Sequence, residues 1–289
     1  MEELMKKCEE MLRTLDKDII RLSVADRSGT IRTIEHERLC RCQNVYSVAK
    51  AFTMTAIGIL YDKGLVSMDE KITDILKDEL PDGMDERWRL CTVEMALQHR
   101  IGLPGGFLDI DVYPISTFGK DFLSYMLTYP LEYTPGEGRA YTDGAFYLLG
   151  RIVAKKSGMG LDEFLWRELF FDLGVQEAAW SHCPMGYAMG ATGLYMHSED
   201  IVKLGALYLC GGVWNGKRLL SEEWCRIAPD RGYAFAWDFS HVMYSKGGMY
   251  GQDLVVYPSQ GIAMAVQTFD ADSDAVTAFF RYNAPQENA

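Results

Sequence analysis

Strand-like segments near both ends of the chain, separated by a long helical middle, are the feature that most restricts the fold. Asp18–Ala25 is rich in β-branched residues, and a glycine-containing turn connects it to a second predicted strand at Thr30–Glu35. Near the other end, Leu254–Tyr257 and Ile262–Phe269 flank a turn and predict a hairpin. The two pairs resemble each other, so we expect one antiparallel sheet built from both ends of the chain.

The middle of the chain has mainly helical patterns, separated by loops rich in glycine and proline. We therefore expect an α+β fold, in which helices flank an antiparallel sheet. Residues 1–64 and 190–289 are predicted to form a discontinuous sheet domain, and residues 65–189 an inserted helical domain.

The segment Ser47–Tyr61 predicts a buried helix, because it is apolar on almost all sides. Lys50 is its one charged residue, and a buried ammonium is costly unless it is paired or functional. Residues three apart on a helix share a face, so the amine of Lys50 lies near the hydroxyl of Ser47. The spacing suits a serine nucleophile with an adjacent base. On this motif alone, the favoured interpretation is a capping serine and a lysine that reaches solvent.

A second group of polar residues, Tyr141-Thr142-Asp143, follows a loop rich in glycine. A phenol beside an ammonium ionises more readily, so Tyr141 is a second candidate base. Asp143 is also well placed to cap the helix predicted over Gly144–Lys156.

A third segment, Lys246–Gly251, contains three glycines just before the C-terminal hairpin. Glycine lets a ligand or another chain approach the backbone closely, and an exposed strand edge can offer N–H groups to an oxyanion. A plain flexible loop is the alternative interpretation.

Together, in this order along the chain, the three segments resemble the group that contains class C β-lactamases, D-alanyl-D-alanine carboxypeptidases and family VIII esterases. The flanking sequences VYSVAK (45–50), HRIGLP (99–104), PGEGRAYTDGAFYLLG (135–150) and KGGMYGQDLVVYP (246–258) also resemble this group. The resemblance covers residues 15–270 and implies a β-lactamase/transpeptidase-like fold.

The resemblance also implies roles for individual residues. Ser47 would be the acylated nucleophile, and Lys50 and Tyr141 would share the work of the general base. Lys246 would position an anionic group or tune Tyr141. The oxyanion hole would use the backbone N–H groups of Ser47 and Met249, with Gly248 beside them.

Two positions depart from the pattern of this group. Asp143 stands where asparagine is usual, and its carboxylate would keep Lys50 charged, which shifts the base role toward Tyr141 or weakens activity. Lys246-Gly247-Gly248 lacks the threonine that β-lactamases use near the substrate carboxylate. We therefore expect a serine hydrolase that acts through an acyl-enzyme on a small ester, amide or D-amino-acid peptide, and not an efficient β-lactamase. The alternative is a weakly active or inactive binding or sensing protein of the same fold.

Composition and charge limit the classes of partner and cofactor that we expect. The net charge of −12 disfavours nucleic acid, and no apolar run is long enough to span a bilayer. The seven cysteines are an odd number, and Cys40 and Cys42 lack a second Cys/His pair at zinc spacing, so no metal or other cofactor is expected. The N-terminus predicts an amphipathic helix and not a secretory signal, which favours a cytoplasmic enzyme with a small-molecule substrate. The oligomeric state stays open.

Overall fold

The computed structural model describes residues 1–14, 19–35, 40–269 and 274–283. The chain forms two compact units. Unit 1 comprises residues 1–48, 170–179 and 195–289, and unit 2 comprises residues 49–169 and 180–194.

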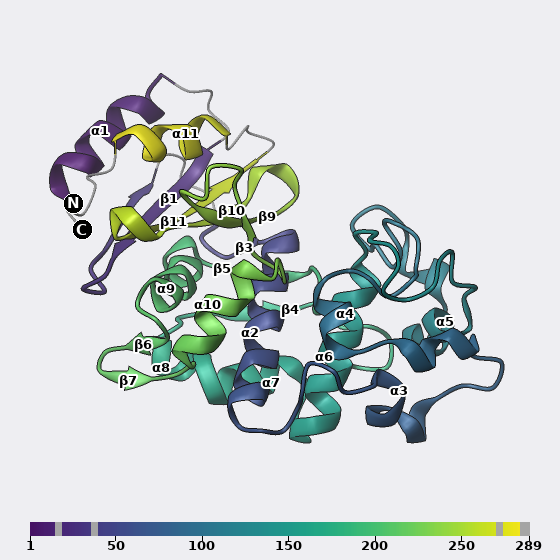
Figure 1. Cartoon of the computed structure of the whole chain (residues 1–289). Coiled ribbons are helices and arrows are strands. Elements are labelled where there is room, and N and C mark those ends of the chain that lie inside the picture. Colours follow the sequence, from purple (N-terminus) through teal and green to yellow (C-terminus); the bar gives the residue numbers. More distant parts are fainter. Residues whose placement is uncertain (15–18, 36–39, 270–273, 284–289) are drawn as a thin grey trace. The chain divides into compact units, whose positions relative to one another are not determined.

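Unit 1 is built on a six-stranded sheet with the order β2-β1-β11-β10-β9-β8. Its strands are β1 (Ile19–Asp26), β2 (Ile31–Glu35), β8 (Ala236–Trp237), β9 (Tyr244–Gly247), β10 (Asp253–Tyr257) and β11 (Ile262–Thr268). All neighbours in this sheet are antiparallel, and β1 from the N-terminus pairs with β11 from the C-terminus (Figure 1). The predicted sheet built from both ends of the chain is thus confirmed; Asp18 lies outside the described residues.

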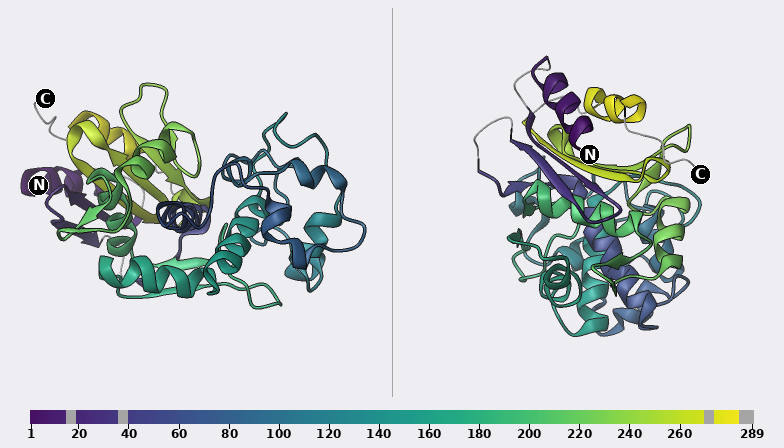
Figure 2. Two further views of the ribbon diagram at one scale, coloured as in Figure 1. Left: turned by 60° about the horizontal axis from the view of Figure 1, so that its bottom comes forward. Right: turned by 90° about the vertical axis from the view of Figure 1, so that its left-hand side faces the viewer.

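Helices cover both faces of this sheet because its side chains alternate between two apolar sets. On one face, α1 (Glu2–Leu12) and α11 (Asp274–Asn283) pack against Val255, Met264 and their neighbours in a continuous core (Figure 2). On the other face lies α9 (Ser198–Leu209), which packs against β1, β10 and β11. Gly205 of α9 permits this close approach, since a Cβ there would lie 2.9 Å from the Cβ of Ala263.

Unit 2 is mainly helical. Its longer helices are α2 (Ala49–Asp62) and α6 (Asp143–Ser157), which pack against each other. The shorter ones are α3 (Ile72–Ile75), α4 (Val93–Leu97), α5 (Phe122–Thr128) and α7 (Leu161–Leu165), with 3-10 turns at Lys77–Glu79, Glu86–Leu90 and Ile115–Phe118. α2 is buried from Ala49 to Leu60, as its sequence predicts.

Smaller elements complete the chain. A three-stranded sheet has the order β3-β5-β4, with β3 (Gln43–Asn44), β4 (Ala178–Trp180) and β5 (Leu194–Met196). The hairpin of β6 (Val213–Trp214) and β7 (Lys217–Arg218) turns at Asn215 and Gly216, and α8 (Phe171–Leu173) and α10 (Glu222–Asp230) belong to unit 1.

The unit boundaries differ from the predicted division in three places. The shortest is residues 190–194, which were assigned to the sheet domain but belong to unit 2. α2 was assigned to the sheet domain, but it belongs to unit 2 because its apolar surface packs on α6 and α7. Residues 170–179 were assigned to the helical insertion, but they belong to unit 1, where α8 packs against α9.

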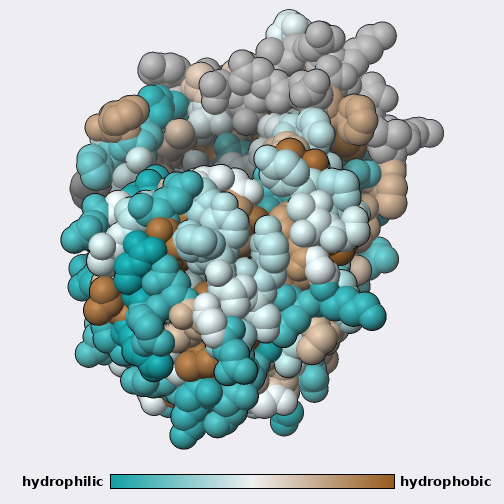
Figure 3. Space-filling view, turned by 90° about the vertical axis from the view of Figure 1, so that its right-hand side faces the viewer, coloured by the Kyte–Doolittle hydropathy of each residue, from teal (hydrophilic) through white to brown (hydrophobic). Residues whose placement is uncertain are grey.

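Within the described ranges, no helix combines the length and apolar character needed to cross a membrane. The face shown in Figure 3 is mainly hydrophilic, with small apolar patches that are separated from one another.

Candidate active site

Ser47 occupies a 3-10 turn, Tyr46–Val48, that runs directly into α2. The predicted helix therefore begins with one tighter turn. Tyr46 has a left-handed backbone (φ 47°), and its N–H donates to the Asn44 side-chain oxygen at 2.9 Å. Left-handed backbone is uncommon for an aromatic residue, so surrounding contacts hold this turn in a fixed shape.

The loop after β9 lies against the backbone of Ser47. A Cβ on Gly248 would lie 2.6 Å from the carbonyl oxygen of Val45 and 3.3 Å from the amide nitrogen of Ser47. Any side chain at position 248 would therefore displace the nucleophile segment. The predicted proximity of this loop to Ser47 is thus present within unit 1.

The two candidate oxyanion donors in this loop are not equivalent. The Gly248 N–H donates to the carbonyl of Gln252 at 2.7 Å, so it is already engaged. For the Met249 N–H, no hydrogen bond to another residue of the described ranges is found.

Lys246 lies on β9, opposite Leu254 of β10. Its ammonium donates to the carbonyl of Gly247 at 2.7 Å, and its side chain is half-buried.

Lys50 lies one helical turn after Ser47 and is completely buried. Its ammonium makes an ion pair with the Asp143 carboxylate at 2.7 Å and also donates to the Ala191 carbonyl at 3.0 Å. Asp143 opens α6, and its side chain is almost fully buried as well. The lysine therefore does not reach solvent, and it is paired with the residue at the unusual position.

The ion pair decides the protonation state of Lys50. Burial by itself lowers the pKa of this amine, but the charges of Asp143 and Tyr141 and its hydrogen bonds to both outweigh burial, and the pKa is raised. At neutral pH Lys50 is an ammonium. It lies 4.8 Å from the centroid of the Tyr141 ring, and Tyr141 is partly open to solvent.

His99 fixes the segment that carries Tyr141. Its carbonyl accepts from Ala140 N–H at 3.0 Å and its Nδ1 accepts from Thr142 N–H at 3.2 Å. Its ring packs on that of Tyr141, with centroids 4.4 Å apart. His99 also has a left-handed backbone (φ 58°). No motif in the sequence indicated this double attachment.

Two further carboxylates lie near Asp143. Asp109 and Asp111 come from one loop of unit 2, and oxygens of the three aspartates lie within 4.8 Å of one another. Burial, followed by repulsion from Asp143, raises the pKa of Asp109, and burial raises that of Asp111 despite its hydrogen bond with Thr192. The surroundings of Lys50 are thus strongly negative, a feature that sequence spacing could not reveal.

Asp143 does not cap α6, contrary to prediction. Thr142 is the N-cap, and its hydroxyl accepts from Gly144 N–H at 3.3 Å. The Asp143 carboxylate instead faces Lys50, because the ion pair satisfies its charge more strongly than a backbone amide does.

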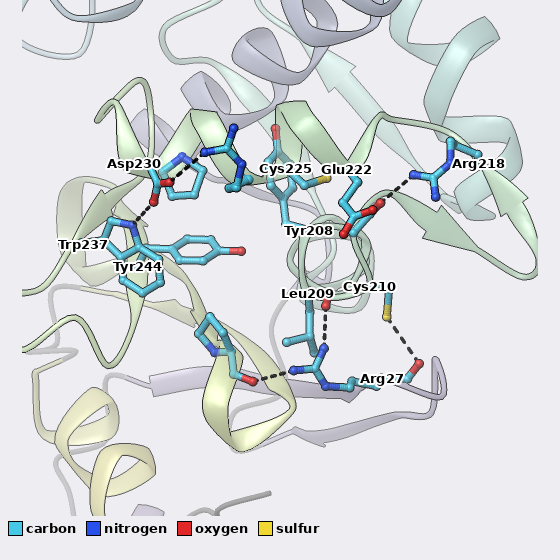
Figure 4. A pocket seen from close by; sticks show the side chains of 14 residues that line it. Arg27, Tyr208, Leu209, Cys210, Arg218, Glu222, Cys225, Asp230, Trp237 and Tyr244 are labelled. Carbon is cyan, nitrogen blue, oxygen red and sulfur yellow. Dashed lines mark hydrogen bonds and ion pairs between the residues drawn. The ribbon is translucent and has the colours of Figure 1, made fainter. Parts of the chain in front are cut away.

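A separate hollow of about 540 Å³ lies in unit 1, and none of the seven predicted site residues lines it (Figure 4). Arg27 in its wall donates to the carbonyls of Leu209 and Pro258 at 2.8 and 2.6 Å. Arg218 donates to the carbonyls of Gly211 and Leu220. These guanidinium groups satisfy backbone carbonyls and so have a structural role.

The fold, the Ser-x-x-Lys turn and the buried Lys50 define a β-lactamase-like protein. Residues 42–282 match the sequence model of the beta-lactamase family, and the chain belongs to this family. The resemblance and the fold class predicted from the sequence are both confirmed.

Relatives within the superfamily differ in activity. The chain is 28% identical over 145 residues to an N-acetylmuramyl-L-alanine amidase of Bacillus subtilis, covering 47% of this chain and 32% of that protein. It is 30% identical over 152 residues to a lovastatin esterase of Penicillium rubens, covering 46% of this chain and 38% of that protein. The chain thus spans about a third of the length of these two relatives. A penicillin-binding protein homologue from Caulobacter crescentus superposes with a TM-score of 0.74 at 14% identity, covering 96% and 95% of the two chains, and supports the fold.

Proposed function

We propose that the protein is a serine hydrolase that cleaves a small ester or amide, including D-amino-acid amides, through an acyl-enzyme on Ser47. The observation that carries this proposal is the buried Lys50 ammonium, hydrogen-bonded to Asp143 and to Tyr141 one helical turn after Ser47. Membership of a family with amidase and esterase relatives supports it.

Tyr141 is the general base in this mechanism. A lysine held as an ammonium has no lone pair to accept a proton, but its charge stabilises a neighbouring phenolate. The Ser47 hydroxyl proton passes to the Tyr141 phenolate as the serine oxygen attacks the substrate carbonyl carbon. Asp143 contributes by keeping Lys50 charged.

The backbone N–H groups of Ser47 and Met249 stabilise the tetrahedral oxyanion. When this intermediate collapses, the bond to the leaving alcohol or amine breaks, and the leaving group takes the proton from Tyr141. Water then attacks the acyl-enzyme by the same route and releases the acid and Ser47. Lys246 acts in the second of its two expected roles, the tuning of Tyr141, because a neutral substrate offers it no anionic group.

Neutral esters and amides are the preferred class of substrate. Asp109, Asp111 and Asp143 surround Lys50 with negative charge, and the Lys246 segment lacks a threonine hydroxyl for a substrate carboxylate. β-Lactams carry such a carboxylate, so their turnover is expected to be slow.

The test is intact mass after exposure to a fluorophosphonate probe, together with hydrolysis of neutral p-nitrophenyl esters. We expect one adduct per chain, absent in Ser47→Ala, and loss of at least a hundredfold in kcat for Tyr141→Phe. Tyr113→Phe, which changes an exposed tyrosine of the same unit, serves as the matched control and retains activity.

The Lys50–Asp143 ion pair also favours a second function, a binding or sensing protein in which the fold has lost turnover. A folded wild-type protein that gives no adduct with any probe, and an acyl ligand bound equally by Tyr141→Phe and the wild type, would establish this function instead.

A further inference from the structure

A mixed cluster of metal-ligating side chains lies at one end of the β3-β5-β4 sheet, in unit 1. Cys42, Glu177 and His197 each place one donor atom within 4.8 Å of the other two. The Nε2 atom of His197 lies 3.3 Å from a carboxylate oxygen of Glu177, and Cys42 is a free, half-buried thiol.

The sheet register explains why residues so far apart in sequence meet here. In the antiparallel β3–β5 pair, Gln43 lies opposite Met196 and Asn44 opposite Tyr195. Continued by one position, the same register sets Cys42 opposite His197, and opposite residues of an antiparallel pair project from the same face. Glu177 directly precedes β4, the strand on the other side of β5.

The donor set matches one type of ion. Thiolate and imidazole ligands favour zinc over magnesium or calcium, which prefer oxygen ligands. Zinc bonds of about 2.0–2.3 Å hold the ligand atoms roughly 3–4 Å apart in a tetrahedron, so small side-chain rotations bring the cluster to binding geometry. Cys40 adds a further thiol nearby, since its sulfur donates to the Cys42 carbonyl at 3.5 Å.

We propose that Cys42, Glu177 and His197 form a zinc site that ties the three strands together. Binding displaces the proton of the Cys42 thiol, so that thiolate, imidazole and carboxylate occupy three positions of a tetrahedron. The expectation of no metal rested on the absence of a second Cys/His pair at zinc spacing; the residue before β4 and the N-cap residue of α9 supply the missing donors instead.

The site is tested by titrating the full-length, chelator-treated protein with Zn²⁺ and measuring affinity, stoichiometry and Tm. We expect one ion per chain and a rise in Tm, because an ion that binds only the folded state stabilises it. Cys42→Ser, Glu177→Gln and His197→Asn should each weaken Zn²⁺ binding by about tenfold or more. Cys210→Ser and His241→Asn, which change a thiol and an imidazole elsewhere in unit 1, should bind as the wild type does.

Co²⁺ gives a readout that does not depend on the variants folding. A thiolate-to-cobalt charge-transfer band in the wild type, removed by one equivalent of Zn²⁺, supports the site. Absence of this band, or Zn²⁺ affinity that Cys42→Ser leaves unchanged, would overturn the proposal.

Discussion

The ammonium of Lys50 and the carboxylate of Asp143 lie 2.7 Å apart in the buried part of unit 2. The pair joins the start of α2 to the start of α6, two helices that also pack against each other. It makes Lys50 a fixed positive charge, and the proposed chemistry follows from this state.

Asp143→Asn keeps a side-chain oxygen beside Lys50 but removes the negative charge. Burial lowers the pKa of Lys50, and the Asp143 charge that counteracts this effect is then gone, so the pKa falls. We expect the alkaline limb of the kcat profile for ester hydrolysis to move to lower pH. Asp78→Asn, at an exposed ion pair with Lys155, is the charge-matched control. An alkaline limb that does not move would separate Lys50 from catalysis.

The same substitution tests the contribution of the pair to stability. The pKa of Lys50 is raised in the folded state, so its contribution is fully present below 10.5 and is lost as the pH rises through the folded-state pKa. Asp143→Asn should lower the free energy of unfolding at pH 7 by about 1–3 kcal/mol. Denaturant titrations at neutral and strongly alkaline pH should show this difference shrinking; a difference that stays constant would contradict the assignment.

Gly248→Ala should abolish hydrolysis, because its Cβ would lie 2.6 Å from the Val45 carbonyl beside Ser47. Gly247→Ala is the matched control, since its Cβ has only the Asp253 carboxylate within reach, at 4.0 Å. The ratio of kcat/KM between the two variants is the measurement. Equal activities would mean that the loop yields without disturbing Ser47.

His99 should act as a positioning residue for Tyr141. His99→Asn tolerates the left-handed backbone and keeps an acceptor for the Thr142 N–H, whereas His99→Ala loses both the acceptor and the ring. We expect kcat to fall about tenfold or more in His99→Ala, with KM little changed, and to recover partly in His99→Asn. The comparison is made on folded protein of matched Tm, and equal kcat in the two variants would count against the role.

The ionised carboxylate of Asp85 stabilises the folded chain, and this stabilisation is lost in acid when the carboxylate is protonated. Its bonds to the Arg87 side chain, opposed in part by burial, lower the pKa of the carboxyl to about 2. A lowered pKa contributes stability above the unfolded value of 3.8 that disappears as the pH falls through about 2. Asp85→Asn should therefore be less stable than the wild type at pH 7 by about 1 kcal/mol, and the two should converge near pH 2 in urea titrations. Curves that remain parallel down to pH 2 would contradict this.

Local patterns were sufficient to predict much of the fold. The strands β1, β10 and β11 are buried along almost their whole length, and α2 is buried from Ala49 to Leu60. The apolar, β-branched or uniformly apolar composition of each segment indicates this burial without reference to its neighbours. The boundary of the helical unit was missed, because it depends on which neighbour α2 packs against. The prediction that Asp143 caps α6 was also wrong, because the Asp143 carboxylate pairs with Lys50, a residue far away in the sequence.

The sequence by itself determined the family and the sheet built from both chain ends, since each follows from short-range periodicity or from a pattern of motifs. Only the tertiary structure decided the partners of the candidate site residues. It brought Asp143, Tyr141 and His99 around Lys50, placed Gly248 against Ser47, and set Cys42 beside His197 and Glu177. Such contacts join residues far apart along the chain, and they arise from strand register and helix packing.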